Sequence, residues 1–223
     1  MCGKFTQMMS WRDVHSLSDL IGRPLEAGPG AEDFKTPMRF ADVIRLDAAG
    51  KRQVSSMRWG SASLRAKTPG DRPEHMHARG ETIDELPTFR GAFKHARGIV
   101  LTKTFNIGEE LPNGKIKQWT LTPRDGQPIA LGVIWERWTN REAELLTFVM
   151  VTTQANAQIA RLDDRMPFVL RPDQWAAWLG ETPATAAELK AMIGPFEGDW
   201  SMEPQTVAKR PVPRSHADEP TLF

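Results

Sequence analysis

Two neighbouring stretches of almost uninterrupted apolar residues constrain the fold of this chain most strongly. They read IALGVIW at residues 129–135 and LLTFVMVTT at residues 145–153. A strand with one face in water alternates apolar and polar residues, whereas a strand buried on both faces is apolar throughout. Both stretches are therefore predicted to be central strands of a sheet.

Other strands and helices are predicted around this pair. GIVLTKTF (98–105) and QWTLT (118–122) also have strand character. Val43–Asp47 and Gln53–Trp59 flank Ala-Ala-Gly-Lys and predict an antiparallel hairpin. N-terminal caps or prolines and closing glycines predict helices at Trp11–Ile21, Thr88–Arg97, Pro172–Leu179 and Pro183–Ile193.

The remaining segments are predicted to be irregular. Residues 28–39 and 61–76 are rich in Gly, Pro and charge, and the segment 201–223 is mostly an extended tail. No repeat or linker divides the 223 residues, so we predict a single domain over 1–223. The fold class is α+β, with a curved, largely antiparallel, barrel-like β-core flanked by helices.

Charge and cysteine content narrow the classes of function. A net charge of +1 is not the general basicity of a protein that coats nucleic acid, although a local basic groove is compatible with it. One cysteine excludes an internal disulfide partner and a multi-cysteine zinc site. With no signal peptide and no membrane span in the sequence, we expect a cytoplasmic protein. We also expect a monomer, and neither a metal nor a cofactor.

The single cysteine, Cys2, directly follows the initiator methionine. Removal of Met1, expected before a small residue, would leave Cys2 with an α-amine and a thiol on adjacent carbons. Their ordinary pKa values are about 7.7–8.0 and 8.5, so both nucleophilic forms exist near neutral pH. Such an aminothiol closes on an aldehyde as a thiazolidine, or acts as an N-terminal nucleophile on an amide. A small buried residue without a role is the competing interpretation.

Two further stretches carry side chains suited to chemistry. In MHARGET (76–82), His77, Arg79 and Glu81 would share one face of a strand, which suits proton transfer beside an anion-binding group. In RLDDRMP (161–167), an acid pair adjoins Arg165. Each stretch also has a purely structural interpretation. The first would be a surface ladder of ion pairs, and the second would be a set of side chains that fixes a loop. A metal site on His75 and His77 is disfavoured because no further ligand motif accompanies them.

In this order the motifs resemble the SOS response-associated peptidase (SRAP) family. The resemblance runs from Cys2 to about Leu179. It is carried by MCGKF, RWG (58–60), A-R-x-E-T (78–82), PTFRGAF (87–93), T-T-x-A-N (152–156) and D-R-M-P (164–167).

The resemblance implies a barrel-like β-core with a DNA-binding groove and a sensor of abasic sites in single-stranded DNA. In that family the processed cysteine, here Cys2, forms a thiazolidine with the ring-opened sugar and crosslinks protein to DNA. The name peptidase reflects proposed self-cleavage of the N-terminal residue. By the same resemblance, the DNA-binding residues are Lys4, Trp59, Arg79 and Arg165.

The chain departs from the family at the groups that assist the cysteine. The family's motif asparagine is His77 here, and its histidine falls on Asp163. Aligned without gaps, its catalytic glutamate falls on Ile107. Glu109 or Glu110 substitutes only if the loop shifts by two or three residues. The predicted catalytic set is therefore Cys2, His77, Asp163 and Glu109.

Three functions follow from these residues. The first is an abasic-site sensor that crosslinks through Cys2. The second is a DNA-binding relative without efficient crosslinking, favoured by the missing glutamate and histidine and opposed by the retained Cys2-Gly3. The third is an N-terminal-nucleophile hydrolase that acts on an amide, in the narrowest case its own N-terminal bond. Whether the chain is an enzyme stays open at this point.

Overall fold

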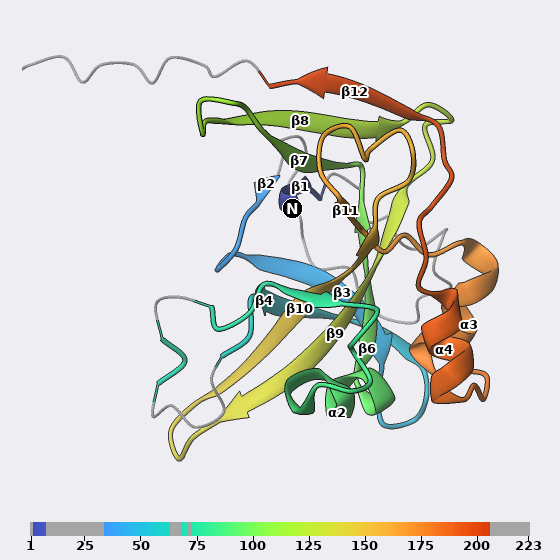
Figure 1. Cartoon of the computed structure of the whole chain (residues 1–223). Helices are drawn as coiled ribbons and strands as arrows, with labels where there is room; N and C mark the ends of the chain where they lie inside the picture. Colours follow the sequence, from blue (N-terminus) through green and yellow to red (C-terminus); the bar gives the residue numbers. More distant parts are fainter. Residues whose placement is uncertain (1, 8–33, 63–67, 71–72, 206–223) are drawn as a thin grey trace, which may run out of the picture.

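The computed structural model describes residues 2–7, 34–62, 68–70 and 73–205 (Figure 1). The helix predicted over 11–21 and the tail beyond 205 lie outside these residues. Twelve strands are described. They are β1 (Cys2–Thr6), β2 (Phe34–Lys35), β3 (Phe40–Leu46), β4 (Arg52–Trp59), β5 (His77–Arg79), β6 (Arg97–Thr102), β7 (Thr104–Glu110), β8 (Ile116–Pro123), β9 (Ile129–Thr139), β10 (Glu144–Gln154), β11 (Arg165–Pro167) and β12 (Trp200–Pro204).

Five of these strands close into a barrel. The ring runs β10–β4–β3–β6–β9 and returns to β10. Every pair in it is antiparallel except β10 with β4, which is parallel. The predicted barrel-like, largely antiparallel core is confirmed. The two apolar stretches form β9 and β10, which pair with each other from Val133 opposite Met150 to Thr139 opposite Glu144.

A second sheet, in the order β12–β8–β7–β1–β2, lies above the barrel in the view of Figure 1. All its pairs are antiparallel. Phe5, Phe105 and Leu121 of this sheet are fully buried against residues that the barrel strands direct inward. We call this cluster the inner core; its barrel members include Val43, Trp59, Val100, Leu131 and Phe148.

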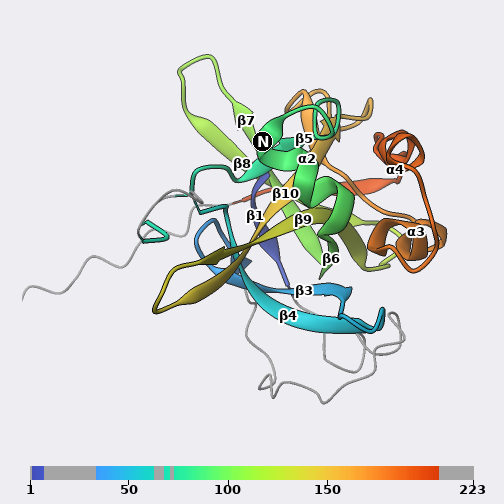
Figure 2. The same ribbon diagram turned by 90° about the horizontal axis from the view of Figure 1, so that it is seen from below.

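The outer core covers the other face of the same strands. Because successive strand residues point to opposite faces, Ile44, Ile99 and Val149 direct their side chains outward, next to inner-core neighbours. They pack under Phe93 of helix α2 (Pro87–His95) and Trp178 of α3 (Trp175–Leu179). Leu189 of α4 (Ala186–Met192) completes the cluster. Figure 2 shows where α2, α3 and α4 lie relative to the barrel strands. Burial on both faces explains why β9 and β10 are apolar throughout.

Several predicted boundaries are wrong for steric reasons. Helix α2 stops at Ala96 rather than at Gly98, which lies inside β6. A Cβ at Gly98 would lie 2.6 Å from Val43 Cγ1, so the glycine permits close strand packing there. The stretch GIVLTKTF is two strands, because the chain leaves the barrel at Lys103 and enters the second sheet.

The last two helices also begin later than predicted. Pro172–Gln174 is a single 3-10 turn before α3, which Gly180 ends with a φ of 98°. Helix α4 begins after Thr185, whose hydroxyl and the Glu188 carboxylate form a capping box, rather than at Pro183. No helix in the described part of the chain is long and apolar enough to cross a bilayer.

Glu136 of β9 provides a test of the electrostatics of the barrel wall. Burial, and secondarily the charge of Glu74, raise the pKa of the Glu136 carboxyl. The folded state therefore holds this proton to higher pH than the unfolded chain does, and stability falls as pH rises through that interval. Glu136→Gln is expected to raise Tm at pH 7 by about 2–4 °C, equivalent to about 1 kcal/mol in a chain of this size.

The gain should disappear below about pH 4, where the carboxyl is protonated in both states. Thermal melts of wild type and variant between pH 3 and 8 measure it. Glu142→Gln, in the exposed β9–β10 turn, is the matched control and should leave Tm unchanged at both ends of the pH range. A constant Tm gain across the whole range would contradict the electrostatic explanation.

Candidate functional site

The N-terminal strand is held between two neighbours. β1 pairs with β2 on one side and with β7 on the other. Cys2 is the Cα partner of Ile107, whereas Lys4 is opposite Asn106, so the register shifts at Gly3. Such a bulge twists the strand locally. The ladder therefore places the backbone of Cys2 beside β7.

The position directly opposite Cys2 is apolar. Ile107 is fully buried in the inner core. This is the position on which the family's glutamate falls in the gap-free alignment. An alkyl side chain neither donates nor accepts a proton, so Ile107 supplies no general acid or base beside Cys2.

Glu109, the predicted substitute, lies two residues further along β7. Its Oε2 accepts a hydrogen bond of 2.8 Å from the indole nitrogen of Trp119 on β8. Glu109 is opposite Lys117 and not opposite Cys2. Its catalytic role stays a prediction, and the contact observed is with an aromatic side chain.

Trp59 is part of the inner core. Its side chain is 0% exposed and its indole nitrogen donates to the Met76 carbonyl at 3.0 Å. Its ring lies against Phe5, with centroids 5.1 Å apart, and meets His77 edge-on at 6.0 Å. The prediction that Trp59 provides a base-stacking surface is corrected here, because no face of the ring is open to a base.

His77 and Arg79 stand at the two ends of the short strand β5. β5 runs parallel to β10, with His77 opposite Met150 and Arg79 opposite Thr152. The strand ends at Arg79, so Glu81 belongs to the following turn and the predicted three-residue face is incomplete. Arg79 is exposed, which its predicted contact with a DNA backbone requires.

Arg165 is a buried cation that makes an ion pair with Glu81 near the surface. It is 9% exposed, and its guanidinium binds both oxygens of Glu81 at 2.5 and 2.9 Å and the Thr152 carbonyl at 2.9 Å. This cation neutralises Glu81 and ties the turn after β5 to β11. The DNA contact of Arg165 stays a prediction. Asp163 fixes the chain just before β11, because its Oδ1 accepts a hydrogen bond of 2.9 Å from the Arg165 backbone amide.

Removing Glu81 should destabilise the fold in a pH-dependent way. The hydrogen bond from Arg165 lowers the pKa of the Glu81 carboxyl. Its stabilisation is therefore complete above the ordinary glutamate pKa of about 4.3 and is lost as pH falls toward the lowered value. Breaking a fully buried pair costs about 3–5 kcal/mol. Because Glu81 is 42% exposed, we expect a loss of about 1–2 kcal/mol for Glu81→Ala at pH 7.

Denaturant melts at pH 7 and pH 3 measure this loss. The difference between Glu81→Ala and wild type should shrink at pH 3. Glu85→Ala, four residues away, is a surface control with a smaller expected effect. An equal loss at both pH values would show that packing, and not the charge of Glu81, holds this turn.

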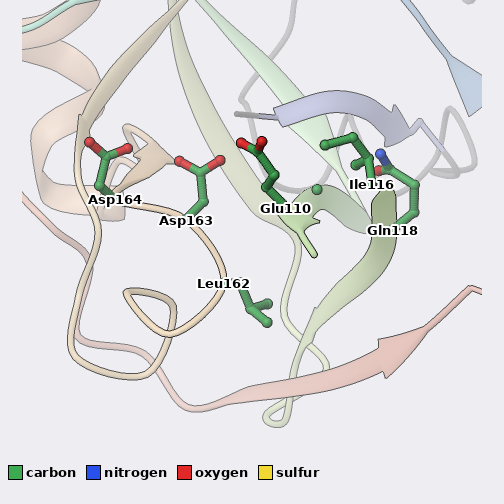
Figure 3. Close-up of a pocket in the computed structure, with 7 residues that line it drawn as sticks. Glu110, Ile116, Gln118, Leu162, Asp163 and Asp164 are labelled. Atoms are coloured by element: carbon green, nitrogen blue, oxygen red, sulfur yellow. The ribbon is translucent and has the colours of Figure 1, made fainter. Parts of the chain in front are cut away.

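A pocket of about 430 Å³ lies between the β7–β8 hairpin and the loop at residues 162–164 (Figure 3). A Cβ at Gly108 would lie 2.7 Å from Ile116 Cγ2, so a side chain there would crowd the pocket wall. The pocket is lined by Gly108, Glu110, Ile116, Gln118, Leu162, Asp163 and Asp164. The three carboxylates place hydrogen-bond acceptors in it, and the predicted acid Asp163 is one of them.

Lys4 belongs to β1, and its side chain contacts β2, the neighbour of β1 on the side away from β7. Its ammonium nitrogen is 3.9 Å from the centroid of the Phe34 ring, a cation–π contact. Phe34 is 43% exposed. Lys4 is two residues from Cys2 and partly exposed, and its ammonium contacts an exposed aromatic ring, so the predicted DNA contact of Lys4 is compatible with this position.

The two neighbouring histidines pack against different aromatic rings. His75 lies edge-on to Phe89 at 5.2 Å, whereas His77 contacts Trp59. Among the described residues, no group of three His, Cys, Asp or Glu side chains is arranged to hold a metal ion.

Comparison with known proteins assigns the family. The family model described as SOS response associated peptidase (SRAP) matches residues 1–212. The chain belongs to the SRAP family. Its structure resembles a crystal structure of a Bordetella bronchiseptica protein with a TM-score of 0.76 and 18% identity, over 92% of this chain and 100% of that one. The crystal structure of a phage-related protein of the same organism matches with a TM-score of 0.68 and 20% identity, over 92% of this chain and 94% of that one.

The named relatives align with most of this chain, but their sequence identity to it is low. The abasic site processing protein YedK of Escherichia coli is 27% identical over 80% of this chain and 79% of its own length. YoaM of Bacillus subtilis, also called an abasic site processing protein, is 23% identical over 89% and 88%. At this distance the fold is shared, and the substituted positions around Cys2 must be judged in this chain itself.

Two features of the site are not predictable from local sequence patterns. One is the Glu109–Trp119 hydrogen bond, which depends on the register of β7 against β8. The other is the pocket beside Gly108, which joins a β-hairpin to a loop about fifty residues later. The signal for the first was QWTLT, where a tryptophan in a predicted strand is followed by alternating polar residues.

Proposed function

We propose that this chain binds single-stranded DNA at abasic sites and forms a covalent thiazolidine crosslink through Cys2 after Met1 is removed. The observation that carries the proposal is that β1 pairs the backbone of Cys2 with β7, two residues before Lys4, whose ammonium lies over the exposed ring of Phe34. Membership of the SRAP family and the printed names of YedK and YoaM support it. We propose further that the protein acts as a monomer in the cytoplasm, where a free thiol persists.

The chemistry needs no cofactor and no change of oxidation state. The α-amine of Cys2 attacks the aldehyde carbon of the ring-opened abasic sugar, and one water leaves as the imine forms. The thiol then adds to the imine carbon, and its proton passes to the nitrogen. A five-membered ring results, with a stable C–S bond that an internal cysteine cannot form, because it has no free amine.

The position opposite Cys2 provides no general acid for proton transfer. Opening of the sugar ring and loss of water both profit from a general acid, usually by about 10²–10⁴-fold. Ile107 supplies none, and His77 with Asp163 is the pair we propose in its place. The crosslink is therefore expected to form more slowly than in SRAP members with a glutamate opposite the cysteine.

A second function is favoured by the same substitution. With Ile107 opposite Cys2, a protein that binds single strands without efficient crosslinking retains every DNA contact of the first proposal. It predicts binding that weakens with salt and is unaffected by Cys2→Ala. An N-terminal-nucleophile hydrolase has no such observation in its favour.

The experiment that separates these functions uses one oligonucleotide in three forms. Wild-type protein is incubated with the abasic strand, with the intact strand, and with an abasic strand whose aldehyde has been reduced to an alcohol. A band that survives denaturing electrophoresis only with the first strand supports crosslinking. No such band, together with retained binding to all three strands, supports the non-covalent function.

A further inference from the structure

A row of backbone partners links Cys2 to a tryptophan two strands away. Cys2 is opposite Ile107 on β7, and Ile107 is opposite Trp119 on β8. Strand neighbours lie about 4.8 Å apart, so the Cα atoms of Cys2 and Trp119 are separated by about 10 Å. Figure 1 shows β1, β7 and β8 side by side in the second sheet. Trp119 therefore stands at the edge of the candidate site.

Trp119 differs from most described tryptophans in its exposure. Trp59, Trp138, Trp178 and Trp200 are almost completely buried, whereas Trp119 is partly exposed beside the inner core. Its indole nitrogen donates to Glu109, which fixes the plane of the ring. A rigid, partly exposed indole is well suited to stacking because it loses little conformational freedom on binding.

A cation accompanies the ring. The ammonium of Lys117 is 4.2 Å from the Trp119 ring centroid. The side chain of Lys117 thus lies over this ring, which also packs against the inner core. When a base takes its place, the ammonium is still close enough to pair with the phosphate of that nucleotide. An aromatic ring with an adjacent cation is the combination that single-strand-binding proteins use.

We propose that Trp119 is the base-stacking surface of this protein, with Glu109 as a positioning residue for its ring and Lys117 as the cation for the attached phosphate. The ligand is a nucleobase of the single strand next to the abasic sugar held at Cys2. The inference rests on the proposed function and gives it the aromatic contact that the buried Trp59 does not provide.

The test measures binding to DNA that has no abasic site and so needs no crosslinking. Fluorescence anisotropy compares a short oligothymidylate with an equally long chain of tetrahydrofuran sugar phosphates, which carries no bases. Trp119→Ala is expected to weaken binding to the first by about five-fold or more and to leave binding to the second unchanged. Trp119→Phe should retain most of the affinity, and it reports on stacking if the alanine variant folds poorly.

Trp135→Ala is the matched control. Trp135 is also partly exposed and also has a cation over its ring, with Arg45 Cζ at 4.9 Å, but it belongs to the barrel and not to the sheet that holds Cys2. The Trp135→Ala variant should bind both oligomers as tightly as wild-type protein does. Equal losses on both oligomers for Trp119→Ala, or no loss on oligothymidylate, would overturn the proposal.

Variants of Glu109 test its positioning role through binding alone. Glu109→Gln keeps an oxygen that accepts from the indole, so binding to oligothymidylate should be retained, while Glu109→Ala should weaken it. A Glu109→Gln variant that loses as much oligothymidylate binding as Glu109→Ala would overturn the positioning role. Absence of any covalent band in wild type would count against the proposed function alone, because stacking is measured without it.

Discussion

Replacing Ile107 by glutamate is expected to raise the rate of crosslinking to abasic DNA by about 10²-fold, the lower end of what a general acid contributes. Ile107 is the backbone partner of Cys2 and is fully buried. Burial raises the pKa of a carboxyl introduced there, so that it still carries a proton near neutral pH. The rate is measured as the growth of the denaturation-resistant band with protein in excess over oligonucleotide.

Ile107→Gln is the control for this gain. It has nearly the shape of glutamate and also introduces a polar group into the core, but it has no proton to donate as an acid. Both variants should lose stability, because a buried polar group without a partner costs about 1–3 kcal/mol. A glutamate variant that melts cooperatively and crosslinks no faster than the glutamine variant would show that an acid at this position has no role.

Replacing Cys2 by alanine is expected to abolish the stable crosslink while leaving affinity for single strands within about two-fold. The α-amine remains in this variant and still forms an imine with the sugar aldehyde, but no thiol closes the ring. The imine hydrolyses during denaturing electrophoresis, so no band survives. Added borohydride reduces the imine and should restore a band, which shows that the DNA still reaches the N-terminus.

Wild-type protein should give its band without borohydride. A stable band from Cys2→Ala without reduction would contradict the thiazolidine and would point to another nucleophile. Loss of DNA binding in that variant would mean that Cys2 acts in the site through contacts other than the covalent bond.

Much of the fold could be predicted because the apolar pattern reflects burial directly. The stretches that became β9 and β10 are apolar on both faces, since inner and outer cores cover them. The hairpin of β3 and β4 followed from its turn residues. What the pattern did not contain was the change of sheet at Lys103 or the placement of Gly98 inside β6, both of which depend on strands distant in sequence.

The candidate site was less predictable for the same reason. A motif identifies residue types, but burial and partners decide what they do. Trp59 and Arg165 matched the family's positions, yet the first is enclosed by Phe5 and Phe148 and the second is neutralised by Glu81. Conversely, Trp119 had no motif to mark it, and only the strand register places it in the row of Cys2.

Covalent capture through the amine and thiol of Cys2 is detected by mass spectrometry of the crosslinked peptide. Protein that has reacted with an abasic oligonucleotide is digested with protease and nuclease, without a reducing agent, and the modified peptide is sequenced. Thiazolidine formation at Cys2 gives a peptide that begins at Cys2, lacks Met1, and carries the sugar adduct on its first residue with the loss of one water. An adduct on Lys4 or any other lysine, or a modified peptide that still begins with Met1, would contradict it.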